Sequence, residues 1–510
     1  MRIELPTRIA PAKTLVFATT LFCVQQLEHT SIVFSVLFFA FVMVGNLAFN
    51  AGGGFSRVSG AYVFLFSVLT CILGVTWKAC VGEPADSNLL VPQLDMAIYA
   101  ASNVMLLIVI LINKRLAGRS HGLATGEINY SLAALGCFIL GLLELLFNVL
   151  GLGGSGSLLG VANQLNQFAP LSVILGTIGA MRDSGGRRSV SFISGTAMLV
   201  IFLLSMVGFT KQGMFEPIAC WLVAAAFSRF KLRPVHYVVL AVFAVASYVI
   251  VPLIAEGRSL ASPNAGYAER AAIVYTILTH LGEAKQAETI AAEHVVASQG
   301  KSGYYNHPQG FIERLSILST DDTLLNFTAQ GNYVGYRPVI ENYENFIPHF
   351  LFPNKPIPYG GNYYAHEIGA YVADADESTG ISFSCMAEAF HIDGWVGIFF
   401  VLPAVWLSLF FVLDAICGDI RRSPWGLLMV VYLAHAAAES LLGGLIWTSF
   451  FGSLGLVFAI FFCTQFAPIV GALFYGGDHP GDFILQPLYV DSLWSVRRLG
   501  VTPPPAPRNL

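Results

Sequence analysis

Cationic, acidic and aromatic side chains that could bind and transform a ligand are concentrated between residues 310 and 400. Three cations occur in this stretch, Arg314, Arg337 and Lys355, and Arg is suited to two-point hydrogen bonding with phosphate or carboxylate oxygens. Carboxylates and imidazoles can accept a proton from a hydroxyl group; the stretch offers Asp322, His349, Glu388 and His391. It therefore combines side chains for anion binding with side chains for proton transfer.

The subsegment FLFPNKPIPYGGNYYAHEIG, residues 350–369, is the stiffest part of this stretch. It should not form a helix, because Pro removes N–H donors and forces the preceding residue out of the α region. Its prolines would hold Lys355 with little conformational entropy left to lose on binding. Aromatic rings that could lie against a sugar surround it, namely Tyr336, Tyr359, Tyr363 and Tyr364.

The composition of the chain points to lipid as the solvent for most of it. Of the 510 residues, 55% are hydrophobic and only 11% are charged, whereas a soluble domain has about 25% charged residues. The net charge of −4, without a basic tract, argues against a nucleic-acid partner. The histidines match no zinc pattern, no P-loop follows the glycines at 153–157, and the eight scattered cysteines are expected to be core residues, so we expect no metal and no cofactor.

Apolar segments predict an all-α polytopic membrane protein with twelve transmembrane helices, since a span needs about 20 apolar residues. The candidate spans are 12–28, 31–50, 61–80, 93–113, 127–150, 158–181, 190–209, 214–229, 235–255, 393–416, 425–444 and 447–470. Lysine and arginine collect in alternate connections, which places both termini in the cytoplasm. The expected organisation is a bundle of nine helices over 1–255, a mostly helical extracytoplasmic loop over 256–391, three helices over 392–470 and a cytoplasmic tail over 471–510.

Polar side chains inside the candidate spans cluster toward the side that bears the large loop. They are Glu144, Asn163, Gln164 and Gln167 in the fifth and sixth spans, and His435 and Glu439, four residues apart, in the eleventh. Such groups can join helices by hydrogen bonds. Alternatively, they can line a polar cavity that opens outward beneath the loop.

Three motifs in the loop resemble the Wzy-type family of bacterial oligosaccharide repeat-unit polymerases. They are an Arg-Leu-Ser helix in FIERLSIL, the proline-bracketed LFPNKP, and the passage STGISFSCMAEAFHIDGWVGIFF, residues 378–400, that leads into the tenth span. The spacing of Glu388, Gly394 and Gly397 and the Phe-Pro-x-Lys-Pro element are the most specific parts. The resemblance covers 310–400 by motif and the whole chain by topology.

This resemblance implies a GT-C-like glycosyltransferase in the bacterial inner membrane. It would move a growing glycan from undecaprenyl diphosphate onto a new lipid-linked repeat unit, without a nucleotide sugar. Arg314, Arg337 and Lys355 would bind the diphosphate, the four tyrosines named above would contact glycan, and Glu388, His391, Asp322 or His349 would act as the base. Membrane lipids are further partners, and the family commonly works with a chain-length regulator.

Two other functions remain open at this stage. One is a lipid-linked oligosaccharide ligase, which would hand the glycan to a lipid A core or to a protein. The other is a non-enzymatic transporter of polysaccharide or lipid. We find no internal repeat of the kind that transporters often carry, and the polar groups in the spans lie off-centre.

Overall fold

The computed structural model describes residues 2–117, 122–123, 128–149, 167–261, 265–283, 285–286, 289–290, 303–307, 312, 315–347, 351–352, 354–356, 359–371 and 380–475. These residues form helices and connections without a β-strand, and an isolated bridge pairs Arg2 with Lys231. Six stretches are long and apolar enough to cross a membrane: Ile32–Ser56, Val58–Val81, Pro92–Ala117, Tyr130–Phe147, Cys385–Cys417 and Leu442–Gln465. The chain is therefore an all-α protein with the composition of a membrane protein.

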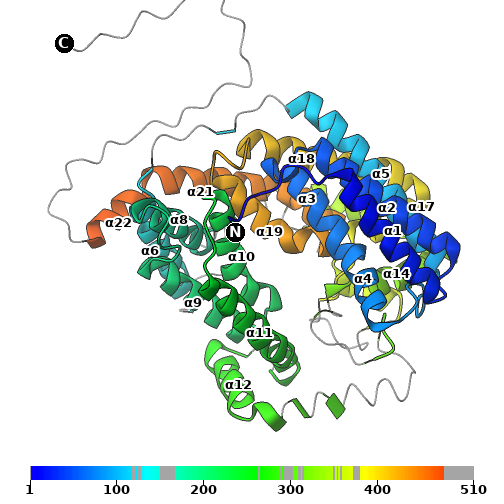
Figure 1. Cartoon of the computed structure of the whole chain (residues 1–510), viewed down its shortest axis with the longest axis horizontal. Helices are drawn as coiled ribbons and strands as arrows, with labels where there is room; N and C mark the ends of the chain where they lie inside the picture. Colours follow the sequence, from blue (N-terminus) through cyan, green and yellow to red (C-terminus); the bar gives the residue numbers. More distant parts are fainter. Residues whose placement is uncertain are drawn as a thin grey trace, which may run out of the picture.

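The helices form two groups joined by a central pair (Figure 1). The first group contains α1 (Pro11–Leu27), α2 (Ile32–Ala51), α3 (Val58–Ser67), α4 (Leu73–Val81), α5 (Pro92–Ala117), α14 (Leu318–Ala329), α17 (Cys385–Val396) and α18 (Leu402–Cys417). The second contains α6 (Tyr130–Val149), α8 (Phe168–Asp183), α9 (Phe192–Val207), α10 (Lys211–Phe227), α11 (Pro234–Leu260) and α22 (Ala467–Tyr475). Between them lie α19 (Trp425–Glu439) and α21 (Ser453–Gln465), and α19 packs on α3 and α10.

Polar contacts define one end of the first group, which we call the basic end. Asp414, near the end of α18, accepts hydrogen bonds from the Ser59 hydroxyl of α3 at 2.6 Å and from the Asn113 amide of α5 at 2.8 Å. Arg57 and Lys114 flank this contact in the sequence, which gives the end its positive charge. The opposite end, where α4 ends and α5 begins, is called the loop end.

Two helices of the predicted loop insert between the long helices instead of covering them. The Asp321 carboxylate of α14 accepts hydrogen bonds from the Tyr99 hydroxyl of α5 at 2.6 Å and from the Ser384 amide at 2.8 Å. Seven residues after Asp321 and seven after Ser384, the Thr328 hydroxyl lies 2.8 Å from Nδ1 of His391. The equal spacing means that α14 and the first half of α17 run side by side in the same direction.

The first half of α17 is a re-entrant helix that reaches the middle of the bundle. Cys385, its first residue, lies 3.8 Å from the hydroxyl of Tyr62, which also accepts a hydrogen bond from the Trp406 indole of α18 at 2.9 Å. Residues 383–392 are all buried. The segment that begins at Cys385 thus starts at the level of Trp406, runs to the loop end, and turns back into α18.

Two glycines make this turn possible. Asp393 and Gly394 leave the helical conformation, and Gly394 has φ 54° and ψ −132°, which a residue with a side chain rarely adopts. Gly397 follows in the π-helical segment η4 (Gly397–Val401), where a Cβ atom would lie 1.7 Å from the carbonyl oxygen of Ala389. The tenth span predicted over 393–416 therefore begins at a real break in the chain.

Described parts of the predicted loop pack against the bundle in two places. Leu324, Tyr364 and Phe383 belong to the main hydrophobic core, whereas α12 (Tyr267–Thr279) packs in a separate cluster. Residues 350–369 do contain a helix, α16 (Gly361–Glu367), because the helix-breaking prolines end at Pro358. A further short helix, α15 (Arg337–Glu344), starts where Pro338 occupies its first turn.

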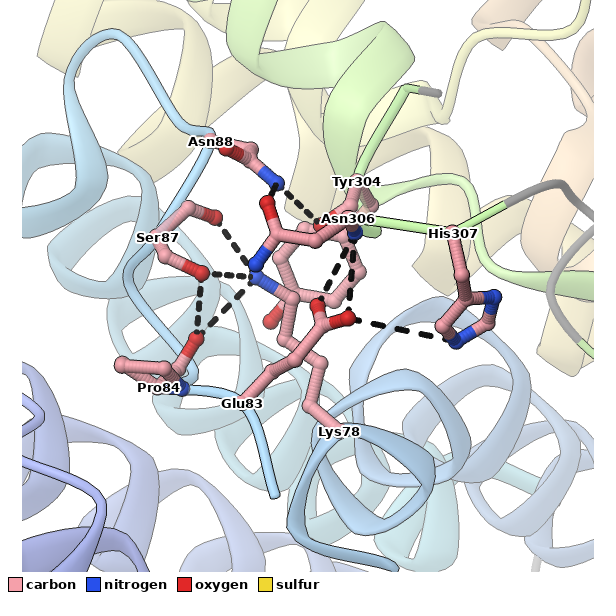
Figure 2. Close-up of polar contacts among 8 residues, drawn as sticks. All are labelled: Lys78, Glu83, Pro84, Ser87, Asn88, Tyr304, Asn306 and His307. Carbon is pink, nitrogen blue, oxygen red and sulfur yellow. Dashed lines mark hydrogen bonds and ion pairs between the residues drawn. The ribbon is translucent and has the colours of Figure 1, made fainter. Parts of the chain in front are cut away.

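A buried lysine fastens another part of the loop to the bundle (Figure 2). Lys78 of α4 is fully buried and donates to the carbonyls of Pro84 and Ser87 at 3.0 and 2.6 Å and to the Ser87 hydroxyl at 2.6 Å. Its ammonium group also lies 4.0 Å from the centre of the Tyr304 ring. Tyr304 is held in turn by its hydroxyl, which donates to the Ala85 carbonyl at 2.5 Å.

Candidate active site

Short helices of the loop and the re-entrant helix meet at the loop end, where the ionisable side chains Glu388, His391 and Glu367 lie close together; we call this group the His391 wall. Glu388 of α17 is buried, and its carboxylate accepts a hydrogen bond from the Tyr364 hydroxyl of α16 at 2.8 Å. Its other oxygen accepts from the backbone N–H of Leu442, the first residue of α20 (Leu442–Trp447). Burial and the nearby Glu388 raise the pKa of Tyr364, so its hydroxyl stays a donor. Glu388 thus joins three helices.

His391 lies one helical turn after Glu388 and is completely buried. Its Nδ1 atom is 2.8 Å from the Thr328 hydroxyl, and its Nε2 atom is 3.2 Å from a carboxylate oxygen of Glu367, the last residue of α16. The Glu367 side chain is 25% exposed. The pair therefore connects a buried imidazole to a carboxylate that solvent can reach.

Arg337 and three tyrosines lie in front of this wall. The Arg337 side chain is 67% exposed and forms an ion pair with Glu341, one turn further along α15. Glu341 and, to a smaller extent, Tyr359 raise the pKa of Arg337. The ring centre of Tyr359 lies 4.2 Å from that of Tyr363 and 6.3 Å from that of Tyr364. The structure therefore brings together Arg337, the tyrosines of 359–364, His391 and Glu388 as neighbours.

Lys355 lies at the other end of α15. Its ammonium group donates to the carbonyl of Asn345, just after the helix, at 2.8 Å, and the Asn345 amide reaches back to the Pro356 carbonyl at 3.3 Å. Eight residues of helix separate Asn345 from Arg337, which corresponds to about 12 Å along the axis. The two cations therefore bracket α15 and do not converge on one point.

Tyr336 marks the tip of the re-entrant turn. Its hydroxyl donates to the Asp393 carboxylate at 2.6 Å, which raises the pKa of Tyr336. The neighbouring Tyr333 ring covers Gly394, where a Cβ atom would lie 3.5 Å from it. Both tyrosines are exposed, so they form an aromatic surface beside Arg337.

Asp322 has a structural environment. Both of its carboxylate oxygens accept hydrogen bonds from the backbone N–H of Leu90 at 2.8 Å, and one also accepts from that of Val91 at 2.8 Å, which holds the chain just before α5. It lies beside the buried Asp321, whose pKa burial raises to about 6 although the Ser384 and Tyr99 hydrogen bonds oppose the shift. We therefore assign Asp322 to holding the segment that leads into α5, away from His391.

The predicted cavity residues fall into two places. His435 and Glu439 form a pair at 3.3 Å, and Glu439 also accepts from the Ser382 hydroxyl at 3.0 Å, just before the re-entrant helix. Glu144 lies on α6 and Gln167 directly before α8, in the other helix group. Among the described side chains, no hydrogen bond connects Glu144 or Gln167 with His435 or Glu439. A single cavity that contains all of them remains a prediction.

Four predicted residues, Arg314, His349, Asn163 and Gln164, lie outside the described residues. Conversely, sequence reasoning missed Glu367 and Thr328, the two partners of His391. The sequence did not single out Glu367, because residues 350–369 are expected not to form a helix that would place it beside His391. Thr328 gave no signal, since a single threonine at the end of an apolar helix is unremarkable.

Comparison of the chain with protein-family models, with curated proteins and with solved structures finds no match.

Proposed function

We propose that this protein is a membrane-embedded glycosyltransferase that joins polyprenyl-diphosphate-linked oligosaccharide repeat units on the extracytoplasmic face of the bacterial inner membrane. The observation that carries the proposal is the group of side chains at the loop end. It contains the exposed Arg337, the rings of Tyr359 and Tyr363, and the His391–Glu367 pair. The hydrogen bonds of Glu388 and the turn at Gly394 hold this group in place. These are the groups that transfer from a lipid diphosphate to a sugar hydroxyl requires.

Each group has a part in this reaction. Arg337 would stabilise the negative charge that develops on the departing diphosphate, since preorganised cations act on charge that appears in the transition state. The rings of Tyr359 and Tyr363 would hold sugar rings beside it. The long apolar helices around the site would accommodate the polyprenyl chain.

Arg337 and Lys355 have unequal parts in this proposal. Arg337 adjoins the His391 wall, whereas Lys355 lies at the far end of α15 and is tied to the Asn345 carbonyl. The reaction involves two lipid diphosphates, one on the growing chain and one on the new unit. In this proposal Arg337 contacts the diphosphate that leaves, and Lys355 contributes to binding away from the reacting carbon.

Purified protein in detergent with lipid-linked repeat unit tests the proposal, because formation of a ladder of longer glycans requires catalysis and cannot arise from transport. Arg337→Ala should lower the rate of ladder formation about 100-fold or more, as loss of a transition-state contact does. Lys355→Ala should lower it about 10-fold or less, since it lies away from the reacting carbon. Arg422→Ala, which removes an exposed arginine beyond the basic end, is the matched control and should leave the rate unchanged.

The outcomes separate the candidate functions. A ligase would transfer a single glycan to an added lipid A core or protein acceptor and form no ladder. A transporter would form neither product. Equal rates for Arg337→Ala and the wild type would exclude Arg337 from diphosphate binding.

A further inference from the structure

The helix that carries Arg337 lies along the candidate membrane span Leu442–Gln465. α15 packs on α20, and the Asn342 side chain covers Gly443, where a Cβ atom would lie 2.5 Å from the Asn342 amide nitrogen. One turn further along α15, the Phe346 ring stacks on the Phe450 ring, with ring centres 4.8 Å apart. Because the two contacts advance together in the sequence, α15 and the span run side by side in the same direction.

The contacts of α15 with this span extend well below the loop end. The Ser408 hydroxyl of α18 donates to the hydroxyl of Ser449, the residue before Phe450, at 3.3 Å. About 21 Å of helix separates Ser408 from the re-entrant turn at Gly394, which is more than half of a hydrocarbon core of about 30 Å. The far end of α15 therefore lies beside the interior of the bundle and not above it.

The side of α15 that faces the protein is polar. It is formed by residues at the i, i+3, i+4 and i+7 spacing of one helix face, namely Pro338, Glu341, Asn342 and Asn345. Glu341 is buried and pairs with Arg337. The two amides donate to the carbonyls of Pro338 and Glu341 at 2.7 and 2.8 Å. The polar groups of this face thus have their partners within α15.

The opposite side of α15 is apolar and exposed. Ile340 and Tyr343 are 51 and 50% exposed, and Ile347, in the turn that follows the helix, is 41% exposed. The exposed charge of α15 is Arg337, at its first residue, whereas Glu344 is only partly exposed. A surface helix of a water-soluble protein has the reverse arrangement, with its apolar stripe toward the core and its polar side outward. The medium outside α15 is therefore expected to be apolar.

The exposed apolar side of α15 continues onto the neighbouring span. Phe450, which contacts Phe346, is 50% exposed, and Leu454 and Phe458, at helical spacing after it, are 45 and 43% exposed. A stretch that crosses a membrane presents such side chains to lipid. The two apolar surfaces are thus one surface, and a bilayer that covers the span also covers α15.

We infer that α15 is embedded in the leaflet at the loop end, with Ile340, Tyr343 and Ile347 against the acyl chains of phospholipids. Arg337, at the end of α15 nearest the loop end, then lies at the level of the lipid phosphates, where an arginine can keep its charged head in a polar region. The inference does not depend on the proposed function, since it concerns the surroundings of the helix and not the chemistry of the site.

Collisions of a nitroxide spin label with oxygen, which partitions into hydrocarbon, and with a nickel chelate, which stays in water, test the inference. The label is attached to Ile340→Cys or Tyr343→Cys in protein without native cysteines, in phosphatidylcholine vesicles without added substrate. We expect oxygen to collide with both labels severalfold more often than the chelate, as at the control Leu454→Cys in the span. Tyr333→Cys, exposed at the loop end, should show the opposite preference.

The depth of the helix gives a second readout. Ile347→Cys should show a higher oxygen-to-nickel ratio than Ile340→Cys, because it lies further from the loop end. A preference for the nickel chelate at 340 and 343 would place α15 in water and overturn the inference. Protection of both labels from both reagents would overturn it as well, since another segment or a second copy of the chain would then cover this face.

The same vesicles separate this inference from the proposed function. If lipid-linked repeat unit is added and no ladder forms, while the labels at 340 and 343 still prefer oxygen, the proposed function fails and the embedding of α15 stands. If a ladder forms while the labels prefer the nickel chelate, the embedding fails and the proposed function stands.

Discussion

At the scale of single residues, the two glutamates near His391 differ in what their oxygens face. Glu388 accepts hydrogen bonds from the Leu442 amide and the Tyr364 hydroxyl, so both of its oxygens are occupied and its side chain is held in place. Glu367 faces an imidazole nitrogen and solvent. The sequence motif drew attention to Glu388, but its contacts give it the task of joining helices.

Glu388→Gln should therefore reduce stability. The amide nitrogen of glutamine cannot accept from either partner, so one buried donor is left without an acceptor, at a cost of about 1–3 kcal/mol. Thermal unfolding in detergent measures this, and Tyr364→Phe should show a similar decrease because it leaves a carboxylate oxygen unpaired. Full stability with complete loss of ladder formation would instead identify Glu388 as a catalytic residue.

The buried Asp321 predicts a pH dependence of stability. Burial raises its pKa to about 6, above the value of about 3.9 for an exposed aspartate. The folded state therefore binds this proton more tightly than the unfolded state, and the resulting stabilisation is present below pH 4 and lost as the pH rises through 6. The melting temperature should rise between pH 7.5 and 5.5, and Asp321→Asn should flatten that rise. An unchanged slope in the variant would exclude Asp321 as the cause.

At the scale of elements, the re-entrant turn depends on Gly397. A Cβ atom there would lie 1.7 Å from the Ala389 carbonyl oxygen, a distance that only a shift of backbone can relieve. Gly397→Ala should separate the first half of α17 from η4, displace His391 from Thr328, and abolish ladder formation. Gly444→Ala is the control, because its Cβ atom would meet only the Ser440 side chain at 3.4 Å. A fully active Gly397→Ala protein would show that the tight approach is unnecessary.

The Lys78 contacts provide a second test at this scale. Lys78→Met keeps the length of the side chain but removes the donors to the Pro84 and Ser87 carbonyls and the attraction to the Tyr304 ring. Segment 303–307 should then detach from α4, so limited proteolysis should cleave it at least several-fold faster than in the wild type. Lys114→Met, at the exposed end of α5, is the matched control. Equal cleavage rates would mean that the segment is held by other contacts.

The sequence predicts the all-α class but not how the loop enters the bundle. Among the described residues six stretches are long and apolar enough to cross a membrane, so the twelve spans stay a prediction. Apolar runs locate the long helices, and the prediction that a span starts at 393 coincides with the break at Asp393 and Gly394. However, residues 385–392 have the same apolar character whether they lie in a loop core or re-enter the bundle. The His391–Glu367 contact joins residues 24 positions apart and depends on that re-entry, so no local pattern could indicate it.

At the scale of the whole molecule, the two ends of the bundle should lie on opposite sides of the membrane. The helical stretch from Gly394 to Cys417 corresponds to about 36 Å, enough to cross a hydrocarbon core of about 30 Å. In a protein without native cysteines, Tyr333→Cys should react with an impermeant maleimide from outside the cell. Arg422→Cys should react only after the membrane is made permeable.

A third position in the same experiment separates the re-entrant arrangement from an external cap. Ala387 lies in the first half of α17 and is fully buried. Ala387→Cys should react from neither side, because residue 387 is fully buried within the bundle. A cap resting on the membrane would instead leave this helix accessible from outside, and rapid labelling of Ala387→Cys there would contradict the insertion. Since His391 shares that helix, the same result decides whether the proposed chemistry takes place within the bundle or above it.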